Sequence, residues 1–232
     1  MIKHCIIGLG EVGMAIKEIF KADGEDPSKN EFAENKHYDY LHICIPYNDY
    51  FVKNVKDYQK KYTPKYTIIH STVPIGTSLE CNANHSPVRG VHPKLKDGIL
   101  TFKKFIGGQD CFELAKEFKN YRIETMCVRD SRETEALKLI DTTQYGNLIM
   151  MQKEIYNWCK KNNLDFNFVY TLANETYNDG YIKLLKPEVV RPYLKHMEGK
   201  IGGHCVLENA KILNRFTPIP MAKHILDENK KL

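Results

Sequence analysis

The chain has 232 residues, of which 42% are hydrophobic and 27% are charged, and its formal net charge is +5 at pH 7. This composition is typical of globular proteins, and the length suits one large or two modest domains with cores of their own. The excess positive charge comes from lysines scattered along the chain, which argues against nucleic-acid binding, although a modest positive field favours an anionic cofactor or substrate.

Cysteine usage and hydropathy indicate the compartment. The seven cysteines are odd in number and never form a CxxC pair, which argues against a disulfide framework and a zinc ribbon. No segment approaches the roughly 18 apolar residues of a membrane span, and the first residues lack the features of a signal peptide. We therefore expect a soluble, cytoplasmic protein with reduced thiols that does not bind membranes.

The N-terminal stretch predicts a strand, a glycine-rich turn and a helix. A short apolar run over residues 2–7 leads into a GxGxxG motif, and a helical pattern follows over residues 14–21. The first glycine allows a tight turn, the second lets a pyrophosphate approach the backbone, and the third lets the helix pack on the strand. The alternative is a glycine turn without a ligand. We predict a dinucleotide site built from Gly8, Leu9, Gly10, Glu11, Val12 and Gly13.

A dinucleotide site of this type also needs an acidic residue about 20 residues further on, at the end of a second strand, to hold the ribose hydroxyls. Residues 20–27 contain no apolar strand, so the second strand must be vestigial, and Asp26 is the best candidate for the acid. An acid here, in place of an arginine, favours NAD over NADP. The alternative is that Asp26 is only a turn residue before Pro27.

The rest of the first 128 residues predicts alternating strands and helices. We expect strands at 40–45, 66–70, 88–91, 104–106 and 123–128, and helices at 49–60 and 111–120. This alternation predicts a Rossmann-type α/β fold with a parallel sheet, whose ligands bind at the carboxyl ends of the strands. Pro46, Tyr47, Ser71 and Thr72 follow two of these strands and are candidate cofactor contacts. Ordinary turn chemistry at strand ends is the alternative.

One long helix follows. Asp130 and Glu133 have the spacing of a capping box, and apolar residues recur at helical period up to about Lys161 without a proline. Such a helix is about 45 Å long, so we expect a spine shared by two bodies, residues 1–128 and 129–232. Lys138 and Thr142 lie four residues apart beside its apolar stripe, where we expect chemistry.

The second body predicts only helices, at residues 166–178, 188–196, 207–214 and 221–230. The glycine-rich stretch 199–204 places Cys205 at or near a helix start, where the helix dipole favours a thiolate. Cys205 is therefore a candidate nucleophile, and a small buried cysteine after a turn is the alternative reading from these residues alone.

Together these stretches resemble the nucleotide-sugar dehydrogenases, the UDP-glucose and GDP-mannose dehydrogenase family of the 6-phosphogluconate-dehydrogenase-like superfamily. The resemblance covers nearly the whole chain in the family's order. Gly-Gly-His-Cys after a long lysine-bearing helix is its most specific part. The matching stretches are residues 8–13, 43–46, 71–76, 135–139 and 202–205.

The resemblance implies two successive hydride transfers from a primary alcohol of a sugar to NAD. By position, Cys205 would trap the aldehyde as a thiohemiacetal and then a thioester, and water would release the acid. Lys138 would stabilise the developing oxyanion, a role worth about 10²- to 10³-fold in rate. Thr72 would orient the water or the reacting oxygen. The family also pairs subunits through the long helix, and Gly146 in its middle fits a close helix crossing, so we expect a homodimer.

The chain departs from the family pattern at several positions. Thr142 replaces an asparagine, Asn209 replaces an aspartate, and residues 92–97 contain none of the family's loop glutamates, although Lys94 there suits an anionic substrate. The family's third domain, which holds the nucleotide half of the substrate, has no counterpart in these residues.

Three alternatives therefore remain besides a nucleotide-sugar dehydrogenase. The first is a one-step alcohol dehydrogenase that uses Lys138 but not Cys205. The second is a non-catalytic NAD-binding or assembly module. The third is a metal protein using Cys81, His85 and His92, which lack ordinary zinc spacing.

Overall fold

The computed structural model describes residues 2–90, 93–202 and 205–232. It divides into two compact units, Met1–Lys138 and Leu139–Leu232, which we call the first and the second unit. The division falls inside the long helix, later than the boundary we expected after residue 128. No helix among the described residues combines the length and the apolar character needed to cross a membrane.

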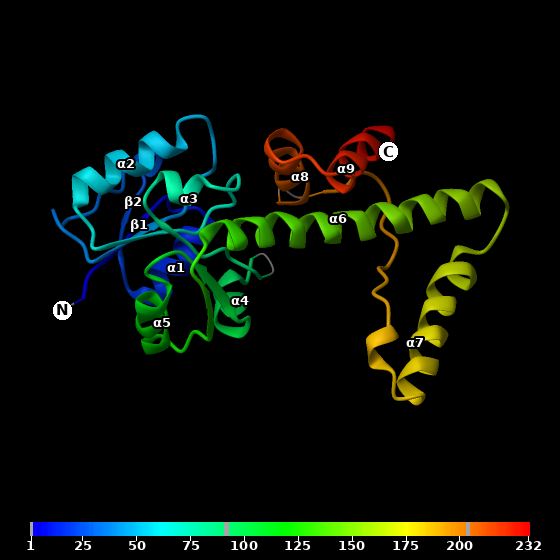
Figure 1. The fold of residues 1–232 in the computed structure, drawn as a ribbon. Coiled ribbons are helices and arrows are strands. Elements are labelled where there is room, and N and C mark those ends of the chain that lie inside the picture. Colours follow the sequence, from blue (N-terminus) through cyan, green and yellow to red (C-terminus); the bar gives the residue numbers. More distant parts are fainter. Residues whose placement is uncertain (1, 91–92, 203–204) are drawn as a thin grey trace. The chain divides into compact units, whose positions relative to one another are not determined.

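The first unit is built on a seven-stranded sheet with the order β2-β1-β3-β4-β5-β6-β7 (Figure 1). Neighbouring strands are parallel except β5 and β6, which pair antiparallel at His85 and Gly107. This arrangement confirms the predicted Rossmann-type fold, and β2 is as short as expected. The strands are β1 His4–Ile7, β2 Asp23–Glu25, β3 Tyr40–Ile43, β4 Tyr66–Ile69, β5 Asn84–His85, β6 Lys104–Gly107 and β7 Thr125–Val128.

Helices cover both faces of this sheet. The neighbouring residues Ile6 and Ile7 of β1 belong to different hydrophobic clusters, because successive side chains of a strand point to opposite faces. One cluster includes apolar residues of α1, α4 and α5, and the other includes those of α2. The helices are α1 Glu11–Phe20, α2 Phe51–Tyr62, α3 Thr77–Glu80, α4 Leu95–Thr101 and α5 Cys111–Asn120, and a 3₁₀ turn spans Pro27–Lys29.

The predicted strand at 88–91 is wrong. The paired residues come earlier, in β5, and Ser86 makes the last backbone bond to β4 by donating its N–H to Ile69. Pro87 has no N–H to continue a ladder, so the chain leaves the sheet there. Val88 is nevertheless buried, which explains why the segment looks like a strand in sequence. Val91 lies outside the described residues.

The second unit is helical. It contains most of α6 Ser131–Lys161, followed by a π-helical stretch Asn167–Leu172, α7 Ala173–Lys183, α8 Cys205–Phe216 and α9 Pro220–Lys231. The predicted helix at 188–196 is wrong, because only the 3₁₀ turn Pro187–Val189 forms there. Pro192 cannot donate a helical hydrogen bond, and Asn178 instead bonds both the N–H and the carbonyl of Arg191.

Gly146 lies where α6 meets the last two helices of the second unit. A Cβ atom on Gly146 would come within 2.6 Å of Val206 Cγ1 on α8 and 2.7 Å of Ile225 Cδ1 on α9. The close helix crossing that we inferred from this glycine therefore exists within one chain. The glycine by itself no longer argues for a second subunit.

The turn after β1 depends on an even closer contact. A Cβ atom on Gly13 would lie 1.8 Å from the carbonyl oxygen of Gly8, whereas a Cβ on Gly10 would meet no atom within 4 Å. We expect Gly13→Ala to lower the free energy of unfolding by about 3 kcal/mol or more, because the backbone must move apart. Gly10→Ala, the matched control, should cost less than about 1 kcal/mol. Urea denaturation measures the free energy of unfolding of both variants. Equal denaturation midpoints for Gly13→Ala and Gly10→Ala would contradict the packing role of Gly13.

Candidate functional site

The glycine-rich turn opens onto a large cavity in the first unit. Gly10 is the N-cap residue of α1, and no described side chain caps that helix end. A cavity of about 1040 Å³ lies beside it, lined in part by Leu9, Gly10, Glu11 and Met14. Gly10 thus offers open backbone at a helix N-terminus, which is the geometry that lets a phosphate approach N–H groups. The residues present fit a dinucleotide.

Asp26 lies directly beside this turn. Its carboxylate accepts hydrogen bonds from the N–H of Leu9 at 3.0 Å and from the N–H and hydroxyl of Ser28 at 3.1 and 2.6 Å. The bonds from Ser28 and from the Leu9 N–H hold the pKa of Asp26 below its usual value. Asp26 is therefore an ionised acceptor at the end of β2, as well as the N-cap of the 3₁₀ turn at 27–29. The turn role expected for this residue is confirmed, and its role toward the ribose hydroxyls stays a prediction.

Lys29 is a site residue that the sequence did not single out. Its ammonium group donates to the carbonyl of Leu9 at 2.5 Å, and the side chain lines the cavity. Its positive charge offsets the negative charge of Asp26. No motif marks Lys29, because its position depends on the 3₁₀ turn that follows Asp26.

The candidate residues at the strand ends have separate roles. Ser71 donates its hydroxyl to the carbonyl of Ile45 at 2.6 Å, which ties the exits of β3 and β4 together. Thr72 follows it and is half-buried. Pro46 lines a second cavity, of about 420 Å³, and Tyr47 packs on Phe51 of α2 with ring centroids 5.6 Å apart.

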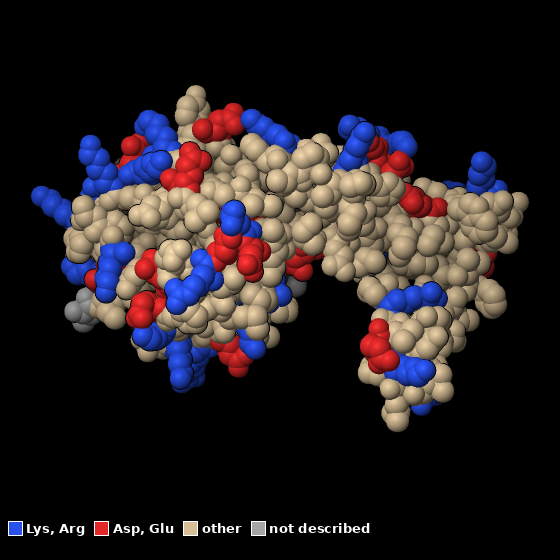
Figure 2. All heavy atoms as spheres, viewed as in Figure 1, with Lys and Arg blue, Asp and Glu red and all other residues tan. Residues whose placement is uncertain are grey.

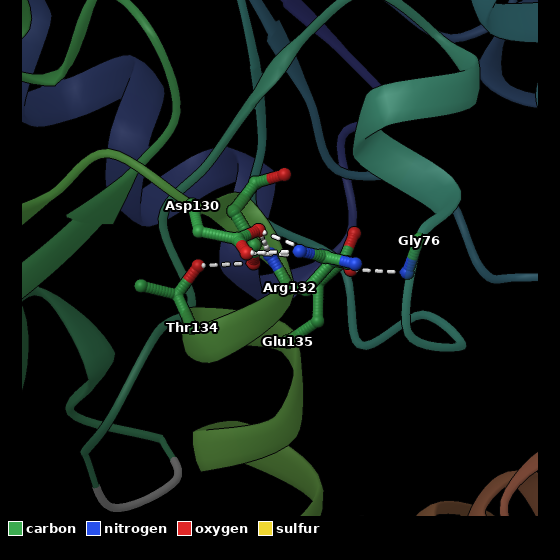
Figure 3. A network of polar contacts seen from close by, with 6 residues as sticks. Gly76, Asp130, Arg132, Thr134 and Glu135 are labelled. Atoms are coloured by element: carbon green, nitrogen blue, oxygen red, sulfur yellow. Dashed lines mark hydrogen bonds and ion pairs between the residues drawn. The ribbon is translucent and has the colours of Figure 1, made fainter.

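Glu135 fixes the segment that follows Thr72, and sequence reasoning missed this role. Its buried carboxylate accepts the N–H of Gly76 at 2.6 Å, as Figure 3 shows. It also accepts the N–H of Ser78 at 2.8 Å. These are N–H groups at the start of α3, so the first turn of α6 holds the start of a second helix. Burial raises the pKa of Glu135. In the same turn, Asp130 accepts from the N–H of Arg132 and pairs with its guanidinium.

Lys138 is held by the segment after β5. Its ammonium group donates to the carbonyl of Val88 at 2.9 Å. The two preceding carbonyls, of Ser86 and Pro87, accept from Lys104 at 3.0 and 3.1 Å. Lys104 is buried, and burial lowers its pKa to about 7. Three successive carbonyls thus orient two lysines in the first unit.

The second unit contains the other candidate residues. Cys205 is the first residue of α8 and is exposed, as expected for a helix start. Asn209 lies one turn further on and donates its amide to the hydroxyl of Thr142 on α6 at 2.9 Å. The structure therefore brings Thr142 and Asn209 together. Gly203 and His204 lie outside the described residues.

The metal alternative gains no support from His85. One ring nitrogen lies 2.9 Å from Thr134 Oγ1 and the other 3.2 Å from the carbonyl oxygen of Ser71. Among the described residues no cluster of three or more potential metal ligands occurs, and His92 is not one of them. All seven cysteines are free thiols.

Charge on the surface is mixed. Figure 2 shows lysine and arginine side chains interspersed with aspartate and glutamate over the visible face, without a continuous basic band. Lysines nevertheless gather around the large cavity, where Lys17, Lys21, Lys29, Lys94 and Lys96 line the wall. The local field there favours an anion.

Known structures share this architecture, although no family model and no curated protein matches the sequence. UDP-D-ManNAc dehydrogenase from Pyrococcus horikoshii superposes with a TM-score of 0.78 at 14% identity, over 99% of this chain and 68% of that chain. UDP-glucose dehydrogenase from Pyrobaculum islandicum gives 0.76 at 16% identity, over 100% and 68%. Mycobacterium tuberculosis 3-hydroxyisobutyrate dehydrogenase gives 0.70 at 13% identity, over 100% and 93%.

The fold is that of the nucleotide-sugar dehydrogenases. The 3-hydroxyisobutyrate dehydrogenase has the same fold. The likeness therefore confirms the predicted architecture of this chain and does not distinguish between the two groups of enzymes. It covers the sheet and the helices that follow it.

The contact of Glu135 with α3 can be tested by one substitution. In Glu135→Gln only one oxygen remains for the two N–H groups, so we expect the free energy of unfolding to fall by about 1–3 kcal/mol. Glu133 is exposed two residues earlier on α6, and Glu133→Gln is the control, with an expected change below about 0.5 kcal/mol. Chemical denaturation at pH 7 measures both, and a neutral effect of Glu135→Gln would show that Glu135 is dispensable.

Proposed function

We propose that this chain is an NAD-dependent oxidoreductase that acts on a primary alcohol or aldehyde of a sugar-like substrate. The observation that carries the proposal is the open glycine turn at the start of α1, with Asp26 and Lys29 bonded to it beside a cavity of about 1040 Å³. Asp26 would accept the ribose hydroxyls, Gly10 would expose N–H groups to the pyrophosphate, and Lys29 would balance its charge. Glu11 in the first turn opposes an anion, which limits the affinity.

Lys138 and Cys205 have the roles that the resemblance implies. NAD supplies the oxidant: two NAD molecules, bound in succession, would each accept one hydride from the substrate carbon. Lys138, oriented by the carbonyl of Val88, would stabilise the negative charge that develops on the substrate oxygen. Cys205 would add its thiolate to the aldehyde carbon to give a thiohemiacetal; a second hydride transfer leaves a thioester, and water releases the acid and the thiol. Thr72 would orient that water.

A second candidate is a one-step alcohol dehydrogenase that uses Lys138 and not Cys205. One observation favours it. The 3-hydroxyisobutyrate dehydrogenase shares this fold with a TM-score of 0.70. A third candidate, an NAD-binding module without turnover, is supported by the neutral Thr142–Asn209 pair.

One set of measurements separates these candidates. NAD affinity is measured by calorimetry, and NADH formation is followed with UDP-sugars, GDP-mannose and short 3-hydroxy acids. We expect Lys138→Met to lower turnover by about 10²-fold or more with little change in NAD affinity. Cys205→Ala should abolish acid formation but leave the NAD affinity unchanged.

Each result decides between specific candidates. A Cys205→Ala variant as active as the wild type would mean the one-step enzyme. NAD binding without turnover on any alcohol would mean the binding module, and no NAD binding would reject the proposal. Glu133→Gln is again a suitable control, because this exposed residue lies on the same helix as Lys138.

We also propose that the chain forms a homodimer through the second unit. Large apolar side chains are exposed there, including Trp158 at 55%, Phe168 at 67% and Leu185 at 87%. Exposed apolar side chains mark protein–protein contacts where they form a contiguous patch. Light scattering should give the mass of two chains for the wild type and of one chain for Trp158→Lys combined with Phe168→Lys. A monomeric wild type would remove the proposal.

A further inference from the structure

A chain of buried histidines crosses the sheet of the first unit. His4 on β1, His42 on β3 and His70 after β4 are each less than 5% exposed. His42 lies 3.0 Å from His4 (Nε2 to Nδ1) and 2.9 Å from His70 (Nδ1 to Nε2). At the inner end His70 Nδ1 lies 2.7 Å from the carbonyl oxygen of Ser86. At the outer end His4 Nε2 lies 3.1 Å from Glu117 Oε1 on α5.

The inner end determines which nitrogen donates and which accepts in every hydrogen bond of this row of histidines. The carbonyl of Ser86 can only accept, so His70 Nδ1 must donate to it. Burial holds the pKa of His42 and of His70 well below 6.5, so both rings are neutral and each carries one N–H. His70 Nε2 is then an acceptor, and His42 Nδ1 donates to it. By the same reasoning, His42 Nε2 accepts from His4 Nδ1.

This order leaves two acceptors facing each other at the outer end. In a neutral His4 that donates through Nδ1, Nε2 has no hydrogen, and its neighbour is a carboxylate oxygen. A contact of 3.1 Å between two lone pairs in a buried site is repulsive unless a proton lies between them. The other carboxylate oxygen accepts from the amide of Asn120 at 3.1 Å, so Glu117 cannot relieve the contact by turning away.

We infer that His4, His42, His70 and Glu117 form a proton-binding site that holds one proton between His4 Nε2 and Glu117 Oε1 in the folded protein. Burial lowers the pKa of His4, which disfavours a fully charged imidazolium at this end of the site. The inference does not depend on the proposed function.

Three aromatic residues surround this end of the site. From β3, Tyr40 stacks on His4 with ring centroids 4.6 Å apart, and burial raises its pKa to about 12. From α1, the neighbour is the apolar ring of Phe20. The Tyr121 hydroxyl lies 3.4 Å from His4 Nε2, farther than the Glu117 oxygen, and it also hydrogen-bonds Glu117, so it is the other group that could place a hydrogen at this contact. The remaining charged or titratable groups that act electrostatically on the three histidines are Asp39, His85 and Lys104.

The site couples folding to pH. In the unfolded chain above about pH 7 the histidines are neutral and Glu117 is ionised, so the unfolded state lacks the shared proton. The folded state therefore binds one more proton there, and stability is lost as the pH rises until the site releases it. Lys104 acts in the opposite direction. Burial lowers the pKa of Lys104 from its ordinary value of 10.5 to about 7, so its contribution to stability rises with pH across that interval.

Comparing variants separates the two effects. In Glu117→Gln the amide donates to His4 Nε2 and its oxygen accepts from Asn120, so every hydrogen bond is kept without the extra proton. Unfolding constants are measured by urea denaturation between pH 7 and 9. We expect the ratio of the wild-type unfolding constant to that of Glu117→Gln to rise about tenfold per pH unit, because the two proteins differ by one bound proton. The pH effect of Lys104 is the same in both proteins and drops out of the ratio.

Two further measurements make the outcome unambiguous. Tyr121→Phe is the matched control, and its ratio to the wild type should stay constant with pH; a Tyr121→Phe result equal to that of Glu117→Gln would assign the proton to the tyrosine and overturn the inference. If Glu117→Gln does not fold, ¹⁵N spectra of the histidines and the infrared carboxyl band of the wild type at pH 7.5 decide. A protonated carboxyl or a doubly protonated His4 supports the site. An ionised carboxylate beside a neutral His4 refutes it, as does a constant wild-type to Glu117→Gln ratio.

Discussion

The contact between Gly8 and Gly13 sets the geometry on which the first unit depends. Because a Cβ atom on Gly13 would lie 1.8 Å from the Gly8 carbonyl oxygen, only glycine lets α1 start this close to the end of β1. The start of α1 then faces the carboxyl edge of the sheet, and Asp26 and Lys29 bond the N–H and the carbonyl of Leu9 in the same turn. Fold and candidate binding site follow from one close approach of backbone to backbone.

A second constraint is the need to satisfy polar groups that lie inside the sheet. Burying a cation or an imidazole without a partner costs several kcal/mol, so each must find an acceptor. The carbonyls of Ser86, Pro87 and Val88 provide it, for His70, for Lys104 and for Lys138. A strand at 88–91 would have used carbonyls of this stretch in a ladder. Because residues 86–88 instead follow an irregular path, their carbonyls are available, and that of Val88 holds Lys138 in a fixed orientation.

The elements with strong local patterns could be predicted from the sequence, and those decided by distant contacts could not. Residues 4–7 and 131–161 follow apolar periodicity and were found close to their true bounds. His4 and His42 lie on apolar strands and His70 directly follows one, and only the register of these strands shows that the three residues meet. Glu135 looks like any helical glutamate, because its partners lie 57 and 59 residues away in sequence.

Thr142 and Asn209 show why single departures from a family pattern are poor guides to chemistry. Asn209 is buried, and its amide donates to the Thr142 hydroxyl. An aspartate at 209 could not donate to that oxygen and would carry a buried charge, so Thr142 would have to donate to it. The two residues present here therefore suit each other as a neutral pair. Any step that needs a carboxylate at position 209 must obtain it elsewhere, whereas the packing of α8 on α6 is kept.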